Sequence, residues 1–251
     1  MSYHEVMTRY STLARLSRYA EDQWGLVTRR QAEEAGISRA TFTRLVAAGV
    51  LERVGHGVYH LAGSPLPEHP GLRAAWLQLA PAISAWERTP DQGVVSHRSA
   101  AALYGLGHLP ADRHDFILPE RRQTRQVDVR VHKRALERGE WTTLHGLPVT
   151  RPSRIAADLL DDEEDPGAVA QLIADAIRGA YDRPPTFARA LAPFAVRFGF
   201  RRNDGAAVLR WLLGLVGDPD AGGWVAEARR SGGGGISGED RSAAIGGRVS
   251  E

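Results

Sequence analysis

The stretch AEEAGISRATFTRLVAAG, residues 32–49, breaks an amphipathic helical pattern at Gly36 and starts a new one almost at once. Glycine adopts a positive φ at little cost, so the chain can turn sharply there. Ser38 then offers a hydroxyl group that can cap the following helix. The pattern therefore predicts two short helices joined by a tight turn, the second ending near Gly49.

The residues around this turn fit a helix-turn-helix. That motif needs a small residue on the first helix, a turn residue that tolerates positive φ, and apolar anchors on the second helix. The chain supplies these features in order with Ala32, Gly36, Ile37, Phe42 and Leu45. The first helix should begin after Thr28, which can form a capping box with Gln31, and a longer helix over residues 8–23 should precede it. A plain two-helix hairpin can show similar spacing.

Short β-type runs follow the helix-turn-helix. VLERVG and VYHLAG flank His56 and Gly57 and predict a hairpin, which would be the wing of a winged helix. SPLPEHP, residues 64–70, contains three prolines and is predicted to be a linker.

The remainder predicts a mixed α/β domain over residues 71–217. Strands are expected at GVVSH, DFIL, VDVRVH and LPVT, and helices at LRAAWLQLA, RSAAALYGL, SRIAADLL and residues 167–181, 186–198 and 204–216. The tail, residues 218–251, lacks apolar periodicity and is predicted to be disordered. The expected fold class is therefore α+β: an N-terminal winged helix-turn-helix domain, residues 1–63, followed by a domain with a small sheet and a helical C-terminal part.

Composition excludes several function classes. The chain has no cysteine, which rules out disulfides, Cys-ligated zinc and thiol nucleophiles. No signal peptide or membrane-spanning apolar stretch is recognisable, which predicts a cytoplasmic protein without a membrane partner. The sequence contains no H-E-x-x-H motif and no Gly-rich phosphate loop. We therefore expect no catalytic residue, no metal and no cofactor.

The second helix of the motif has an outer face suited to DNA. Its apolar residues cluster on one side, and the opposite side carries Ala40, Thr43, Arg44 and Ala47. Short side chains allow a close approach to base edges, and arginine can bind guanine with two hydrogen bonds. Ser38 and Arg39 at the helix N-terminus suit a phosphate. The predicted DNA-binding residues are Arg29, Arg30, Ser38, Arg39, Ala40, Thr41, Thr43, Arg44, Arg53 and His56, the last two in the hairpin.

Charge predicts modest affinity for each copy of this domain. Residues 1–61 hold eight arginines against six acidic residues, so binding should be weak and strongly dependent on salt. Residues 113–154 are more basic, with ten Arg or Lys against five acidic residues. The basic charge of this segment has two interpretations. It can belong to a strand face that is simply exposed to solvent, which is the commoner case, or it can form a second surface that binds nucleic acid. The candidate residues for that surface are Arg121, Arg122, Arg125, Arg130, Lys133 and Arg134, the first three in a predicted hairpin loop.

Two further patterns have competing interpretations. Ser96 and His97 are adjacent, but neighbouring helical residues point about 100° apart, so we expect no nucleophile–base contact and a capping role for Ser96. The acidic run DDEED, residues 161–165, could hold Mg²⁺. The commoner arrangement is a solvated helix end, with Asp165 before Pro166 opening the next helix.

Three segments in order resemble the AbiEi-family antitoxins of type IV toxin-antitoxin systems. They are TRRQAEEAGISRATFTRLVAAGVLERVGHGVYHLAG, SHRSAAALYGL and LPVTRPSRIAADLL, and the likeness extends over about residues 10 to 180. The resemblance implies that the N-terminal domain binds inverted repeats of double-stranded DNA in its own promoter and represses transcription. It also implies that the C-terminal domain counters a nucleotidyltransferase-like toxin without a stable complex.

Two other functions stay open at this point. One is a stand-alone winged-helix regulator whose second domain senses a ligand or mediates oligomerisation. The other is a metal-dependent nuclease that uses the acidic run and the scattered histidines. For the oligomeric state we expect a monomer or a weak dimer.

Overall fold

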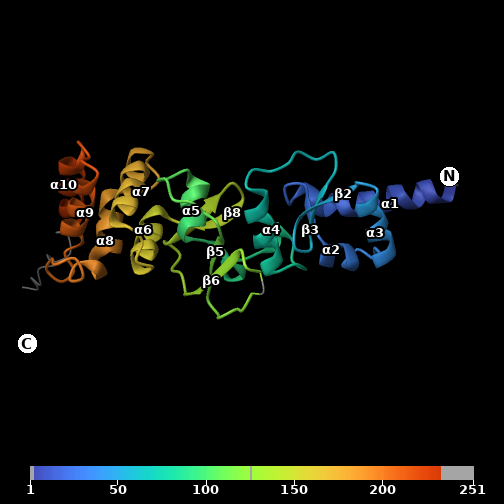
Figure 1. The fold of residues 1–251 in the computed structure, drawn as a ribbon, viewed down its shortest axis with the longest axis horizontal. Coiled ribbons are helices and arrows are strands. Elements are labelled where there is room, and N and C mark those ends of the chain that lie inside the picture. The colour runs from blue at the N-terminus through green and yellow to red at the C-terminus, as the bar shows by residue number, and fades with distance from the viewer. Residues whose placement is uncertain (1–2, 125, 233–251) are drawn as a thin grey trace, which may run out of the picture.

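The computed structural model describes residues 3–124 and 126–232. The molecule is elongated, and the chain runs along its long axis (Figure 1). The first helices lie at one end, a sheet lies in the middle, and a group of helices forms the other end. This arrangement confirms the predicted α+β fold class.

Residues 3–61 form a winged helix. Its elements are α1 (Tyr3–Glu21), β1 (Leu26–Thr28), α2 (Arg29–Glu34), α3 (Arg39–Ala47), β2 (Leu51–Gly55) and β3 (Val58–Leu61). The predicted capping box is confirmed: the Thr28 hydroxyl accepts a hydrogen bond from the Gln31 amide, and the Gln31 side chain accepts one from the Thr28 amide. Gly36 has a φ of +75°, and Ser38 caps α3 by accepting from the Thr41 amide at 3.2 Å. Local capping chemistry therefore sets both helix starts.

The wing is a three-stranded antiparallel sheet of order β1-β3-β2. The predicted hairpin supplies β2 and β3, and β1 is an additional strand between the first two helices. Strand β1 pairs with β3, with Val27 opposite Tyr59. It is only three residues long, which is too short to show an alternating pattern in the sequence.

A five-stranded mixed sheet occupies the centre, with the order β6-β5-β4-β8-β7. The strands of this sheet and the helices around them are α4 (Pro70–Leu79), η1 (Ala85–Glu87), η2 (Pro90–Gln92), β4 (Val94–Val95), α5 (His97–Tyr104), β5 (His114–Leu118), β6 (Val129–Lys133), β7 (Trp141–Leu144) and β8 (Leu147–Thr150). Strands β5 and β6 run parallel. The prediction that Arg121 and Arg122 lie in a hairpin loop is therefore wrong, because a hairpin joins antiparallel strands. Arg125 lies outside the described residues.

Helices form the far end: α6 (Pro152–Asp161), α7 (Pro166–Arg178), α8 (Pro184–Leu191), η3 (Ala192–Phe194), α9 (Gly205–Leu215) and α10 (Ala221–Gly232). The prediction that the tail is disordered from residue 218 is wrong for its first part, which forms helix α10. Its Val225 and Ala228 are buried in the main core. These two residues are three positions apart, as on one face of a helix, but the glycines and charged residues around them make this spacing hard to recognise in the sequence. The rest of the predicted tail, residues 233–251, lies outside the described residues.

The winged helix shares its packing with the central sheet. Leu26 and Val58, from β1 and β3, are fully buried in the same apolar cluster as Leu72 and Trp76 of α4. A second, smaller cluster around Leu16, Phe42 and Leu45 holds the helix-turn-helix together. Helix α4 is thus packed against the wing, and the division into residues 1–63 and 71–217 remains a prediction.

Within the described part of the chain, no helix is both long enough and apolar enough to cross a membrane.

Candidate functional site

Helix α3 is anchored by its inner face. Phe42 and Leu45 are buried, and the Phe42 ring meets Tyr59 of β3 edge to face, with ring centroids 4.8 Å apart. The opposite face exposes Ala40, Thr43, Arg44 and Ala47 to solvent. The structure thus brings the predicted base-reading residues together on one exposed helix face.

A short hydrogen-bonded chain positions Arg44 on this face. The Ser38 hydroxyl donates to the Thr41 hydroxyl at 3.0 Å, and the Arg44 guanidinium donates to the same oxygen at 3.2 Å. Arg39 is exposed at the N-terminus of α3 and, within the described residues, takes part in no ion pair. Helix α3 therefore presents Arg39 at its N-terminus, where an anion is favoured, and Arg44 further along the same exposed face.

The two arginines of α2 are engaged with acidic neighbours. Arg29 pairs with Glu33 at 3.2 Å, and Arg30 pairs with Glu34 at 3.1 Å. Such exposed pairs contribute little stability, but the two glutamates repel an approaching phosphate. The predicted phosphate contacts of Arg29 and Arg30 stay predictions.

The wing tip lies against helix α4. The Gly57 carbonyl accepts a hydrogen bond from the Arg29 amide at 2.9 Å, and His56 lines a pocket of about 390 Å³ together with Gln78 and Arg122. Arg53 donates to the carbonyl of Gly55 at 3.3 Å and is exposed. The two predicted wing contacts, Arg53 and His56, are therefore accessible on a hairpin that α4 supports.

Two residues of the predicted second basic surface, Arg130 and Arg134, are paired with acidic residues in and just after α6. Arg130 binds Asp162 through two hydrogen bonds of 2.8 and 3.3 Å. Arg134 binds Asp158 at 3.1 Å and Asp161 at 3.2 Å. Arg122 donates to the Leu79 carbonyl, whereas Arg121 and Lys133 are exposed. Nucleic-acid binding by this surface remains a prediction. Because Arg130 and Arg134 are paired with carboxylates, the surface offers fewer unpaired positive charges than the sequence indicates.

Asp165, the last residue of the acidic run, opens helix α7. Its carboxylate accepts a hydrogen bond from the Ala168 amide at 2.9 Å, and Pro166 occupies the first turn. The predicted helix-opening role is confirmed.

The prediction that Ser96 and His97 make no contact is wrong. The Ser96 hydroxyl and His97 Nδ1 lie 2.9 Å apart, and the Ser96 side chain makes no capping hydrogen bond. The physical reason is the backbone: Ser96 is extended, and His97 has a φ of +50°. Two such residues do not follow the angular spacing of a regular helix.

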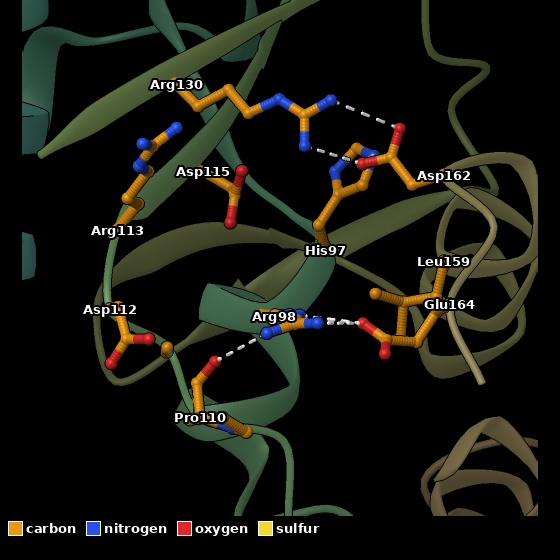
Figure 2. A pocket seen from close by; sticks show the side chains of 11 residues that line it. His97, Arg98, Pro110, Asp112, Arg113, Asp115, Arg130, Leu159, Asp162 and Glu164 are labelled. Carbon is orange, nitrogen blue, oxygen red and sulfur yellow. Dashed lines mark hydrogen bonds and ion pairs between the residues drawn. The ribbon is translucent and has the colours of Figure 1, made fainter. Parts of the chain in front are cut away.

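His97 belongs to a compact cluster at the head of α5. Its ring stacks on that of His132 from β6, with centroids 3.6 Å apart and planes 13° apart. His132 Nε2 lies 3.0 Å from a carboxylate oxygen of Asp115 on β5. Figure 2 shows the His97 ring next to the Arg130–Asp162 pair, beside a pocket of about 240 Å³. The sequence shows Ser96 next to His97 and places Asp162 in an acidic run, but it does not indicate that His97 and His132 meet, because the two histidines come from separate elements, α5 and β6.

Burial keeps the His97 ring neutral. Loss of hydration lowers the pKa of His97 to about 2, and the nearby His132 and Arg130 add to this effect. A neutral imidazole can accept a hydrogen bond or bind a metal through one ring nitrogen while the other donates.

The lowered pKa of His97 predicts a loss of stability in acid. Because the unfolded chain gains a proton below about pH 6.5 and the folded chain does not, this group should lower the free energy of unfolding by about 2 kcal/mol between pH 7 and pH 5. His97→Gln should show a correspondingly smaller loss. Urea unfolding of both proteins at the two pH values, in a chelating buffer, measures the difference; equal losses would contradict a neutral His97.

The capped helices, the glycine turn and the three-stranded wing define the N-terminal part as a winged helix-turn-helix. Residues 14–62 match the family described as "Transcriptional regulator, AbiEi antitoxin". The resemblance predicted from the sequence is thus confirmed over this segment, and it supports a role as a transcriptional regulator.

Comparison with solved structures finds a similarity to the RV2827C protein from Mycobacterium tuberculosis. The two share 18% sequence identity over 86% of this chain and 81% of that chain, with a TM-score of 0.48. No curated protein matches the sequence.

Proposed function

We propose that the protein is a sequence-specific DNA-binding repressor of its own promoter. It also acts as the antitoxin of a type IV toxin-antitoxin system and counters a nucleotidyltransferase-like toxin. The observation that carries this proposal is the exposed face of α3, which lies within the segment that matches the AbiEi antitoxin regulators. No catalytic step is assigned to the chain, and its partner for repression is double-stranded DNA.

The chemistry of this face supports base reading rather than simple solvation. A solvated helix face ordinarily carries long charged side chains, whereas here Ala40, Thr43 and Ala47 leave the backbone accessible. Arg44 is long enough to reach a guanine edge from this flat surface. Arg39 and Ser38 at the helix start suit a phosphate and would fix the helix in the major groove.

Replacing Arg44 with alanine should weaken binding to the protein's own upstream DNA by about 1–3 kcal/mol, because a bidentate contact to guanine is lost. Binding to scrambled DNA should change much less. Fluorescence anisotropy with both DNAs over a series of salt concentrations measures the effect.

Arg39→Ala is the matched control, because a lost phosphate contact weakens both DNAs about equally and makes binding less dependent on salt. An equal loss on both DNAs for Arg44→Ala would contradict the base-reading role. For the antitoxin part, the test has two steps: find whether a neighbouring gene encodes a nucleotidyltransferase-like protein, and then measure whether this chain rescues the growth of cells that express that protein. Failure of rescue with operator binding intact would leave a stand-alone regulator.

A further inference from the structure

We propose that His97, His132 and Asp162 form a binding site for a divalent first-row transition metal ion such as Zn²⁺. The three residues come from the start of α5, from β6 and from the turn after α6. One ring nitrogen of each histidine and one carboxylate oxygen of Asp162 all lie within 4.8 Å of one another. This site is separate from the DNA-binding face, so the proposal does not depend on the function proposed above.

The two imidazoles are held by their outer neighbours. Ser96 lies 2.9 Å from His97 Nδ1, and Asp115 lies 3.0 Å from His132 Nε2. Metal-binding histidines commonly use one ring nitrogen for the ion and the other for a hydroxyl, carboxylate or carbonyl that fixes the ring. Both rings of this cluster therefore have such an outer partner. An ion bound by both rings must lie in the plane of each, so the stacked rings have to turn apart about these hydrogen bonds to bind it.

The separation between His97 and Asp162 fits an ion better than a direct contact. His97 Nε2 and the nearer carboxylate oxygen of Asp162 are 3.9 Å apart, which is too long for a hydrogen bond. Two bonds of about 2.0–2.2 Å each, as Zn²⁺ makes with nitrogen and oxygen ligands, span this gap. Asp162 is exposed and follows the last turn of α6, so its side chain can adjust to complete the geometry.

The donor set selects the class of metal. Imidazole nitrogens suit Zn²⁺, Co²⁺, Ni²⁺ and Fe²⁺, whereas Mg²⁺ and Ca²⁺ prefer oxygen ligands alone. Three protein ligands leave a coordination position for water or a small anion. The adjoining pocket, which His97 and Asp162 help to line, has room for it.

Arg130 is the competitor of the ion. Its guanidinium holds both carboxylate oxygens of Asp162 in the structure (Figure 2). A bound cation would take one of these oxygens and would be repelled by the nearby guanidinium. Removing the charge of Arg130 should therefore strengthen metal binding, an effect that a purely structural role of the cluster would not produce.

The test is titration of the chelator-treated full-length protein with Co²⁺ and Zn²⁺. We expect one ion per chain, visible absorption bands from protein-bound Co²⁺, and no binding of Mg²⁺. His132→Asn and Asp162→Asn should each weaken binding by about 100-fold or more, since loss of an outer partner alone costs about 10-fold to 100-fold. Arg130→Gln should bind more tightly than the wild type.

His108→Asn provides the matched control, because His108 is exposed and lies outside the cluster. Its affinity should equal that of the wild type. Circular dichroism checks that the variants are folded, and Asp162→Asn alters only an exposed side chain. Absence of binding by the wild type, or equal affinities of the wild type, His132→Asn and Asp162→Asn, would overturn the proposal.

Discussion

Replacing Gly205 with alanine is expected to destabilise the folded protein by about 3 kcal/mol or more, at the upper end of the cost of overpacking. Gly205 is the first residue of α9, and a Cβ atom there would lie 1.8 Å from the carbonyl oxygen of Ala188 and 2.8 Å from the amide nitrogen of Ala192. Both atoms belong to the backbone, so no side-chain rotation can relieve the clash. Helices α8 and α9 would have to separate. Chemical denaturation followed by circular dichroism measures the loss.

Gly214 is the matched control in the same helix. It is exposed, and a Cβ atom there would meet nothing within 4 Å. Gly214→Ala should therefore stabilise the protein by about 0.5–1 kcal/mol, because alanine loses less conformational freedom in a helix. If both variants changed stability by the same amount, close packing at Gly205 would not be the cause.

Replacing Phe42 with alanine should destabilise the helix-turn-helix by about 3–5 kcal/mol, which is the usual cost of truncating a buried aromatic ring. Phe42 is 5% exposed and packs on Tyr59. Among the residues whose burial the structure describes, the cluster to which it belongs has eight buried members, so few other contacts compensate. Hydrogen exchange should show faster exchange of the α3 amides, and DNA binding should be lost.

Thr43→Ala separates this effect from lost DNA contacts. Thr43 is the exposed neighbour of Phe42 on the same helix. This variant should keep the exchange rates of the wild type and alter only DNA binding. Wild-type exchange of the α3 amides in Phe42→Ala would contradict the anchoring role.

The parts of the fold that depend on local chemistry could be predicted from the sequence. Thr28, Gly36 and Ser38 set the helix boundaries through hydrogen bonds and φ values within four residues of each helix end, and all three act as predicted. Pairing between distant strands could not be predicted in this way. Strands β5 and β6 pair in parallel, with Phe116 opposite Val131, and nothing in the sequence near either residue indicates its partner.

The candidate sites show the same division. The exposed face of α3 follows from helical periodicity, so the sequence alone predicts which residues lie on it. The cluster of His97, His132 and Asp162 arises from three separate elements, and the left-handed backbone of His97 has no sequence signal in a non-glycine residue. The ion pairs of Arg130 and Arg134 likewise depend on how the C-terminal end of α6 lies next to β6.

The burial of Leu26 and Val58 against α4 makes the winged helix energetically inseparable from the rest of the molecule. Any event in the C-terminal half that shifts α4 changes the free energy of the wing, and thermodynamic linkage makes the effect reciprocal. A ligand that binds the winged helix and the state of the C-terminal half would therefore influence each other. A fragment cut after residue 63 would lose this coupling, because it would expose the apolar surface that α4 covers.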